Sequence, residues 1–131
     1  MAKVTGLGGI FFKSRDPAAL SAWYAKHLGL TVEDWGGVRF NEDEQHPGYT
    51  LWSPFAADTG YIGPGPQPYM INFRVDDLDA LLAQLRADGV DVDERVDQSE
   101  FGRFGWITDP EGNRIELWQS PEQSTWKAAG P

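Results

Sequence analysis

The chain predicts one order of secondary-structure elements twice, and this repetition limits its fold more than any other feature. An apolar segment of period two at 9–14 predicts a strand. Asp16 and Pro17 then provide an N-cap and a proline at the first helical position. Apolar residues at helical spacing predict a helix over 18–28, which Gly29 ends. Short strands are predicted to follow at three places, near 31–34, 38–41 and 49–53.

The second half of the chain repeats this order. Alternating residues predict a strand over 69–75, and the pair Asp76-Asp77 can cap the helix that follows. A stripe of leucines predicts that helix, and Gly89 ends it. Three further strands are predicted, at 90–96, 104–108 and 114–118. Because the order is shared, we infer a duplicated unit of one strand, one helix and three strands.

The length of 131 residues suits one domain and is too short for two independent cores. The stretch 55–67, rich in Gly and Pro, divides the chain and is predicted to be a linker between the halves, a lid, or both. We therefore expect a single domain over 1–131. Its parts are a first module at about 6–54, a second module at about 68–119, and a tail at 120–131 that contains Trp126 and predicts no role.

Composition excludes several classes of partner. The chain has 20 Asp and Glu residues against 11 Lys and Arg, a formal net charge of −9, which repels phosphate backbones and anionic lipid. We therefore expect neither nucleic-acid nor membrane binding. The absence of cysteine excludes disulfides, thiolate metal ligands and a cysteine nucleophile. No signal segment is recognised and no apolar run is long enough to span a membrane, so a cytoplasmic location is expected.

Three motifs occur in the order found in a known superfamily. The first covers 15–30 and reads R-D-P, then W-Y, then L-G-L. The second, at 73–78, reads F-R-V-D-D-L, and the third and most specific, at 109–117, reads D-P-E-G-N-R-I-E-L. Together they resemble the glyoxalase/bleomycin-resistance/dioxygenase superfamily, also called the vicinal oxygen chelate superfamily, over about 6–119.

The resemblance implies an α+β fold. Two βαβββ modules would form a curled, cup-shaped mixed sheet with helices on the outer faces, and the ligand site would lie on the concave face. Many members of the superfamily form dimers or exchange modules, so the resemblance also implies a homodimer. Whether the modules pair within one chain or between chains stays open.

Strand alternation assigns side chains to the cup by a separate argument. Apolar residues at every second position, 71–75 in one strand and 115–117 in another, should pack on a helix, which turns the residues between them toward the cup. Applied to each strand, alternation predicts a cup lined by Phe11, Thr50, Trp52, Met70, Asn72, Arg74, Arg114, Glu116 and Trp118. Such a mixture of aromatic area and few polar groups suits a small organic ligand.

Simpler roles remain open for several of these residues. Trp52 and Trp118 could fill a core or a dimer interface. Arg74 and Glu116 could do no more than neutralise each other on neighbouring strands, and Arg114 could be a solvated charge at a strand end.

The metal site of the superfamily is largely missing. Relatives such as glyoxalase I hold a divalent metal through one side chain on each of four strands, and these positions fall here on Gly9, Met70, either Thr50 or Trp52, and Glu116. Only the glutamate is an ordinary ligand, whereas a catalytic site needs about three protein ligands. The two histidines, His27 and His46, lie at no metal-ligand spacing and are expected to be structural or surface residues. We predict no cofactor, and a divalent metal would need atypical ligands.

The sequence therefore favours a metal-independent small-molecule binding protein, like the bleomycin-resistance branch of the superfamily, with an aromatic or cationic ligand. One alternative is a lyase or isomerase-type enzyme acting on a small carbonyl compound. There Glu116 would be the general base, and Arg74 or Arg114 would stabilise the oxyanion. A metal-dependent glyoxalase or dioxygenase with atypical ligands, and a structural module without a ligand, are further alternatives.

Overall fold

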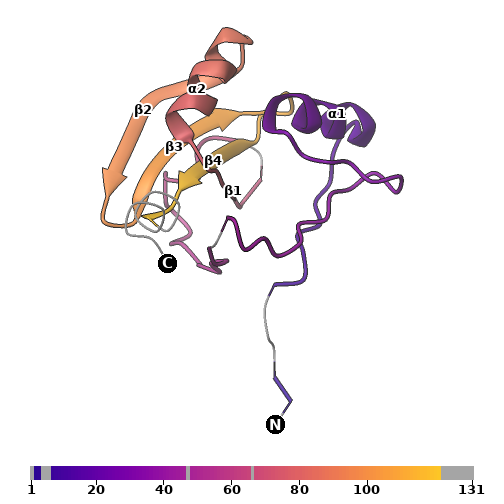
Figure 1. Cartoon of the computed structure of the whole chain (residues 1–131), viewed down its shortest axis with the longest axis horizontal. Helices are drawn as coiled ribbons and strands as arrows, with labels where there is room; N and C mark the ends of the chain where they lie inside the picture. The colour runs from indigo at the N-terminus through magenta and orange to yellow at the C-terminus, as the bar shows by residue number, and fades with distance from the viewer. Residues whose placement is uncertain (1, 4–6, 47, 66, 122–131) are drawn as a thin grey trace.

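A computed structural model of the chain describes residues 2–3, 7–46, 48–65 and 67–121. Its elements, in chain order, are α1 (Pro17–Leu28), β1 (Ile71–Arg74), α2 (Leu78–Ala87), β2 (Asp91–Ser99), β3 (Gly102–Thr108) and β4 (Arg114–Gln119), as Figure 1 shows. All four strands come from the second half of the chain. They confirm the strands predicted there, although β1 is shorter than expected and β2 longer.

The four strands form one mixed sheet in the order β1-β4-β3-β2. The edge strand β1 is parallel to β4, while β4, β3 and β2 are successively antiparallel. Register places Asn72 beside Glu116, and Glu116 beside Trp106, so these three residues form one row across three strands. A curled mixed sheet with two helices is the α+β fold that the resemblance implied.

Both helices begin and end as the sequence predicts. The Asp16 side chain accepts a hydrogen bond from the backbone N–H of Ala19 at 3.1 Å, and Asp77 accepts one from Ala80 at the same distance. Helix α1 ends at Gly29, whose φ of 70° is a left-handed conformation that favours glycine. In the part of the chain that the structure describes, no helix is long and apolar enough to cross a lipid bilayer.

Helix α2 covers one face of the sheet and builds most of the core. Leu78, Leu82 and Leu85 are buried against the alternate residues Ile107, Ile115 and Leu117 of the two central strands. Close approach of α2 depends on Gly105, where an added Cβ would lie 3.0 Å from a Leu82 methyl carbon. The predicted helix-facing set is therefore confirmed, and Ile71, Phe73 and Val75 pack against the same cluster.

The four strands predicted for the first half do not form. In the described residues near 9–14, 31–34, 38–41 and 49–53, the structure has only one isolated bridge, between Val32 and Val38, at a turn through Gly36. A strand is stable when a partner completes its hydrogen bonds and one of its faces is buried. Neither condition is met in the described residues of the first half, because the segments form no hydrogen-bonded ladder and side chains such as Phe11 and Trp52 are 95% and 82% exposed.

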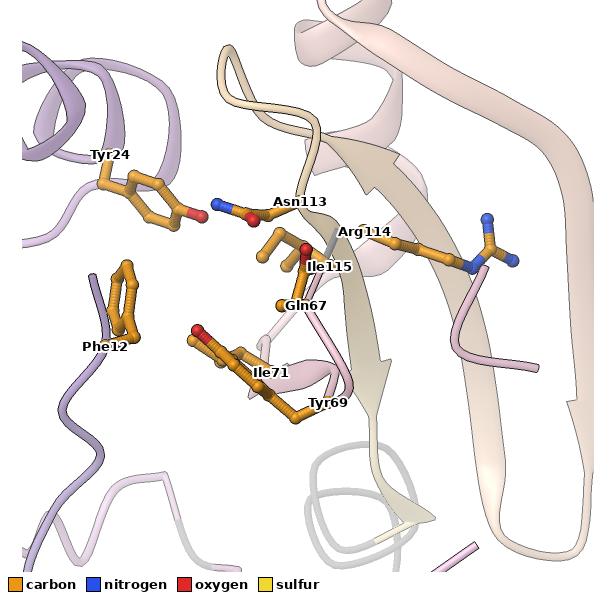
Figure 2. Close-up of a pocket in the computed structure, with 8 residues that line it drawn as sticks. All are labelled: Phe12, Tyr24, Gln67, Tyr69, Ile71, Asn113, Arg114 and Ile115. Atoms are coloured by element: carbon orange, nitrogen blue, oxygen red, sulfur yellow. The ribbon is translucent and has the colours of Figure 1, made fainter. Parts of the chain in front are cut away.

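Helix α1 is attached to the second half by the closing turn between β3 and β4. The Tyr24 hydroxyl donates to the buried carboxylate of Asp109 at 2.7 Å, and burial together with this bond raises the pKa of Tyr24 far above its usual value. The carboxylate of Glu111 accepts from the Ser14 hydroxyl at 2.8 Å and from the Arg15 N–H at 2.9 Å, beside the start of α1. Figure 2 shows Tyr24 of α1 pointing toward the turn residue Asn113.

Candidate functional site

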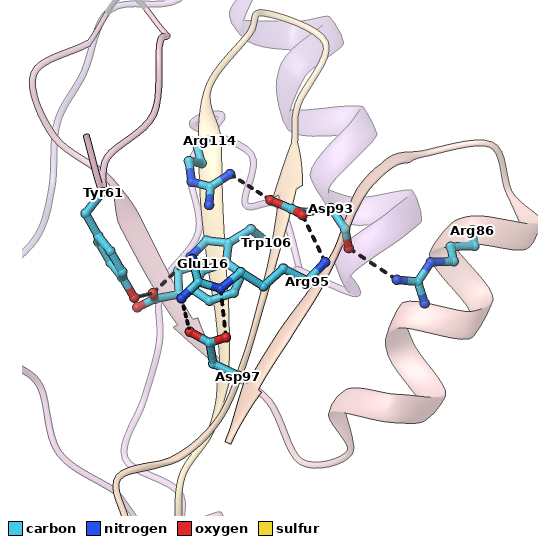
Figure 3. Close-up of polar contacts among 8 residues, drawn as sticks. All are labelled: Tyr61, Arg86, Asp93, Arg95, Asp97, Trp106, Arg114 and Glu116. Carbon is cyan, nitrogen blue, oxygen red and sulfur yellow. Dashed lines mark hydrogen bonds and ion pairs between the residues drawn. The ribbon is translucent and has the colours of Figure 1, made fainter. Parts of the chain in front are cut away.

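The candidate site lies on the sheet face opposite α2, around the carboxylate of Glu116. This side chain is buried, with only 6% of the residue exposed. It accepts hydrogen bonds from the Asn72 amide at 2.6 Å, from the Trp106 indole N–H at 3.0 Å, and from the Tyr61 hydroxyl. We call these four residues the Glu116 cluster, and Figure 3 draws three of them, Tyr61, Trp106 and Glu116. Three donors satisfy a carboxylate whose burial would otherwise be costly.

The sequence positions three members of the cluster through strand register. Asn72 on β1, Glu116 on β4 and Trp106 on β3 lie side by side in the sheet and share the face that does not pack on α2. Trp106 is 1% exposed, so its indole N–H needs a buried acceptor, and Glu116 provides it.

The fourth member, Tyr61, comes from the segment 55–65 between the two halves. Its ring stands edge-on to Trp106, with centroids 6.1 Å apart, and stacks on Phe55 at 5.5 Å. Partial burial and the hydrogen bond to Glu116 raise the pKa of Tyr61, so the phenol keeps its proton and acts as a donor at neutral pH. Segment 55–65 therefore does more than connect the halves, because it supplies a side chain to the site.

Two arginines cover the Trp106 ring. The guanidinium of Arg95 lies 5.5 Å from the ring centroid and that of Arg114 lies 5.3 Å from it. Arg95 makes two hydrogen bonds of 2.8 Å to Asp97, and Arg114 approaches Asp93 at 3.4 Å. A hydrogen bond from the Arg95 backbone N–H, aided by Arg114, lowers the pKa of Asp93. The two cations over the ring are thus each matched by a carboxylate (Figure 3).

A second aromatic group lies on the same face. Trp118 stacks on Phe104 with ring planes 3° apart and centroids 6.0 Å apart, and Tyr49 meets it edge-on at 5.5 Å. The Trp118 indole N–H donates to the carbonyl of Phe101 at 2.7 Å. Trp118 is therefore buried by neighbours within the chain and is held by its own hydrogen bond.

Some of the residues predicted for the cup come together in the structure and others do not. Asn72, Arg114, Glu116 and Trp118 share the face opposite α2. Arg74 lies beside Trp118 in register, and its side chain lies against Gly48, in the space that a Cβ there would occupy. Of the other four, Met70 is half-buried directly before β1, and Phe11, Thr50 and Trp52 are exposed in the first half.

Sequence reasoning missed Tyr61, Trp106 and Arg95. The sequence pattern could have identified Trp106, because alternation along 104–108 places it on the sheet face opposite to that of the helix-facing Ile107. Arg95 follows from pairing with the same strand, although a register shift between Val92 and Val96 obscures the alternation. No sequence signal identifies Tyr61, because the segment around it has no period.

The residues present do not fit the divalent metal of the superfamily. Both oxygens of Glu116 already accept hydrogen bonds, and Asn72 and Trp106 present N–H groups, which a cation cannot use as ligands. Among the described residues, no three His, Cys, Asp or Glu side chains gather where they could hold a metal ion. His27 is buried near Asp88 at 3.6 Å, and His46 lies near Asp43 at 4.0 Å, so each has a local acidic neighbour.

Two hollows away from the Glu116 cluster offer few polar groups or little room to a ligand. A groove of about 510 Å³ beside α1 is almost entirely apolar, being lined by Pro17, Ala18, Ser21, Ala22, Ala25, Val32 and Gly36. The space between α1 and the sheet edge in Figure 2 leaves no room for a water molecule. A binding site needs a few convergent polar groups to orient its ligand. The Glu116 cluster provides such groups.

Comparison with known proteins is informative about the family. The family model for the Glyoxalase-like domain matches residues 9–118. The integron cassette protein VCH_CASS1 from the mobile metagenome of V. cholerae has a similar fold, with a TM-score of 0.55 and 19% identity over 91% of this chain and 98% of that one. TnmS3, an antibiotic binding protein from Streptomyces sp. CB03234, gives a TM-score of 0.47 at 25% identity over 77% of this chain and 84% of that one.

A shorter match has higher identity. A glyoxalase/bleomycin resistance protein from Streptomyces sp. CB03234 is 41% identical over 37% of this chain, with a TM-score of 0.35, and the match spans 42% of that protein's length. No curated protein matches the chain. Because the family model covers most of the sequence and the sheet has the expected form, the chain belongs to the glyoxalase-like domain family of the vicinal oxygen chelate superfamily.

Proposed function

We propose that this protein binds a small organic molecule without a metal, on the sheet face opposite α2 and over the Glu116 cluster. One observation carries the proposal. Glu116 is a buried carboxylate held by neutral donors among aromatic rings, in the row that Asn72, Glu116 and Trp106 form across the sheet. Large apolar area with a few fixed polar groups is the usual composition of a small-molecule site.

The hydrogen bonds of the cluster favour binding over metal chemistry. Asn72 and Trp106 fix the orientation of the Glu116 carboxylate, so its remaining lone pairs point in set directions. An oriented acceptor of this kind selects a ligand that carries a hydrogen-bond donor. A divalent cation would instead require further oxygen or nitrogen lone pairs, which the neighbouring donor groups do not offer.

The enzymatic alternative receives less support from the contacts. A lyase or isomerase that uses Glu116 as its base also needs a cation that stabilises the oxyanion formed on the substrate. Arg114 instead faces Asp93 and the Trp106 ring. Arg74, the other predicted oxyanion partner, lies against Gly48.

A titration tests the proposal. Three naphthalene compounds that differ in charge, 2-naphthol, 2-naphthoate and 2-naphthylmethylammonium, are added to the protein labelled with ¹⁵N, and the indole N–H signals are followed by NMR. We expect saturable binding of at least one compound that shifts the Trp106 signal, and Glu116→Gln should weaken it about tenfold, the loss of one charge-assisted hydrogen bond. Trp35→Ala, at an exposed residue of the first half, is the matched control and should leave the affinity unchanged.

The same titration also tests whether binding requires a metal ion. The dissociation constants measured before and after treatment with EDTA should agree. A large loss of affinity on EDTA treatment, restored by a divalent metal, would show that the site needs an ion. Turnover in a lactoylglutathione-formation assay would contradict the proposal and support the alternative of a metal-dependent glyoxalase.

A further inference from the structure

We propose that the phenol ring of Tyr61 occupies the place of the ligand's own ring when no ligand is bound. The ligand class is then a neutral aromatic molecule that carries a hydroxyl donor, and segment 55–65 must move aside to admit it. This inference rests on the proposed function, because it assumes that the ligand lies over the Glu116 cluster.

The contacts of Tyr61 are those of a bound small molecule. Its hydroxyl donates to Glu116, its ring meets Trp106 edge-on with an interplanar angle of 87°, and its face stacks on Phe55 at an angle of 19°. One oriented hydrogen bond and two aromatic contacts are what a protein site offers to a phenol. Figure 3 shows the ring entering from the loop toward Glu116 and Trp106, and not from a strand of the sheet.

The segment that carries Tyr61 is held mainly by contacts that a displacement could break. Within 55–65 the described backbone hydrogen bonds are two local turns, from Thr59 to Ala56 and from Gly63 to Gly60. The segment takes part in no strand, and Tyr61 itself is 37% exposed. Elements with few buried contacts and no ladder open at low cost in free energy. The side chain can therefore leave while the sheet stays intact.

The charges around the ring favour a neutral donor over a charged ligand. Arg95 and Arg114 already lie over Trp106, so a ligand cation could take a place over the ring only by displacing one of them from the ring and from its carboxylate partner. An anionic ligand would instead face the carboxylate of Glu116, which lies beside the same ring. A hydroxyl group satisfies Glu116 without adding a charge and without the large desolvation cost of an ion.

Occupation of the ligand's place by the Tyr61 ring also lowers the affinity of the protein for its ligand. The apparent dissociation constant of any ligand equals its intrinsic value divided by the fraction of molecules in which the ring has left the site. Removing the Tyr61 side chain should therefore create a vacancy that fits the molecule it resembles. That molecule is 4-methylphenol, which is the tyrosine side chain itself.

Complementation of Tyr61→Ala tests the inference. The indole N–H signal of Trp106, assigned through Trp106→Phe, should move in Tyr61→Ala because Glu116 loses a donor. Adding 4-methylphenol should return the signal toward its wild-type position in a saturable manner. The ether 4-methylanisole, which has the same ring and no donor, should bind about tenfold or more weakly, the value of one hydrogen bond to a charged acceptor. Tyr61→Phe, whose ring still fills the space, should show no saturable response.

Each outcome decides the question. Equal affinity of Tyr61→Ala for 4-methylphenol and 4-methylanisole would overturn the inference, and so would a Trp106 signal that does not return toward its wild-type position. If the alanine variant fails to fold, Tyr61→Ser is used for the same measurement. Failure here is distinguishable from failure of the proposed function. If wild-type protein binds 2-naphthylmethylammonium or 2-naphthoate at Trp106 while 4-methylphenol does not complement Tyr61→Ala, the binding function stands and the ligand class is wrong.

Discussion

The two halves of the chain predict the same order of elements, yet only the second half forms a sheet. There, four strands share their hydrogen bonds and bury alternate residues under α2. In the described part of the first half, one helix forms and the strand-like segments around it have no ladder. The difference teaches that an alternating pattern specifies which way side chains would face. It does not supply the partner that makes a strand.

The halves meet through both polar and apolar contacts. Tyr24 reaches Asp109, and Glu111 reaches the start of α1, both across the turn that closes the second half. Leu20 and Tyr24 add apolar area to the shared core. The first half thus depends on the second for its placement, and the following predictions test how far this dependence goes.

The largest expected difference between the halves is in the rate of amide hydrogen exchange. Amides of β3 and β4 lie in the centre of the sheet and should exchange about a thousandfold more slowly than amides at 9–14 and 49–53, because core elements open only with global unfolding. Exchange measured by NMR residue by residue provides the test. Comparable protection in both regions would mean that the first half has a partner under the conditions of the measurement.

A pair of leucine substitutions compares the halves energetically. Leu82→Ala removes a side chain that is 2% exposed between α2 and the sheet, and should lower the free energy of unfolding by about 2–5 kcal/mol. The matched change Leu51→Ala, at a residue 65% exposed in the first half, should alter it by less than about 0.5 kcal/mol. Urea unfolding measures both. A large loss at Leu51 would contradict the contrast drawn here.

A hydroxyl deletion probes the attachment of α1. Tyr24→Phe leaves the buried carboxylate of Asp109 without one of its donors and should cost about 1–3 kcal/mol of unfolding free energy. Tyr49→Phe, which removes the hydroxyl of an exposed ring, serves as the control with little expected loss. Exchange of the α1 amides should rise in Tyr24→Phe and not in Tyr49→Phe if the bond positions the helix.

The smallest expected effect is on how the free energy of unfolding changes at acidic pH. Hydrogen bonds from the Arg15 backbone N–H and from Ser14 hold the pKa of Glu111 below its ordinary value of 4.5. The ionised group therefore stabilises the fold above about pH 4.5, and this contribution is lost as the pH falls further through the folded-state pKa. Glu111→Gln should flatten the fall in unfolding free energy over that range. If the fall in unfolding free energy at acidic pH is the same in Glu111→Gln as in the wild type, protonation of Glu111 does not contribute to the stability of the fold.

Much of the second half could be predicted from the sequence, since its signals are local. Asp77 and Gly89 delimit α2, and alternation along 114–118 assigns Ile115 to the core and Glu116 to the opposite face. The same reasoning applied to 9–14 assigned Phe11 to a cup that this half does not build, because the pairing of distant segments leaves no local trace. Sequence could place the α1 caps for the same reason that it could place those of α2.

The site could be predicted only in part. Glu116 and Asn72 follow from alternation, and their hydrogen bond follows from the parallel register of β1 and β4, which the sequence does not state. Tyr61 reaches the site from an irregular segment, so its position depends on the path of a loop that no period describes. A residue of that kind is found only once the sheet it covers is known.

The outer strand β2 has a consequence for how copies of this protein behave in concentrated solution. It forms one edge of the sheet, and five of its nine residues, Asp91, Asp93, Glu94, Arg95 and Asp97, are charged, with a net negative sign. A second molecule that extended the sheet at this edge would bring like charges together. The open edge therefore resists the strand-by-strand growth that leads to fibrils.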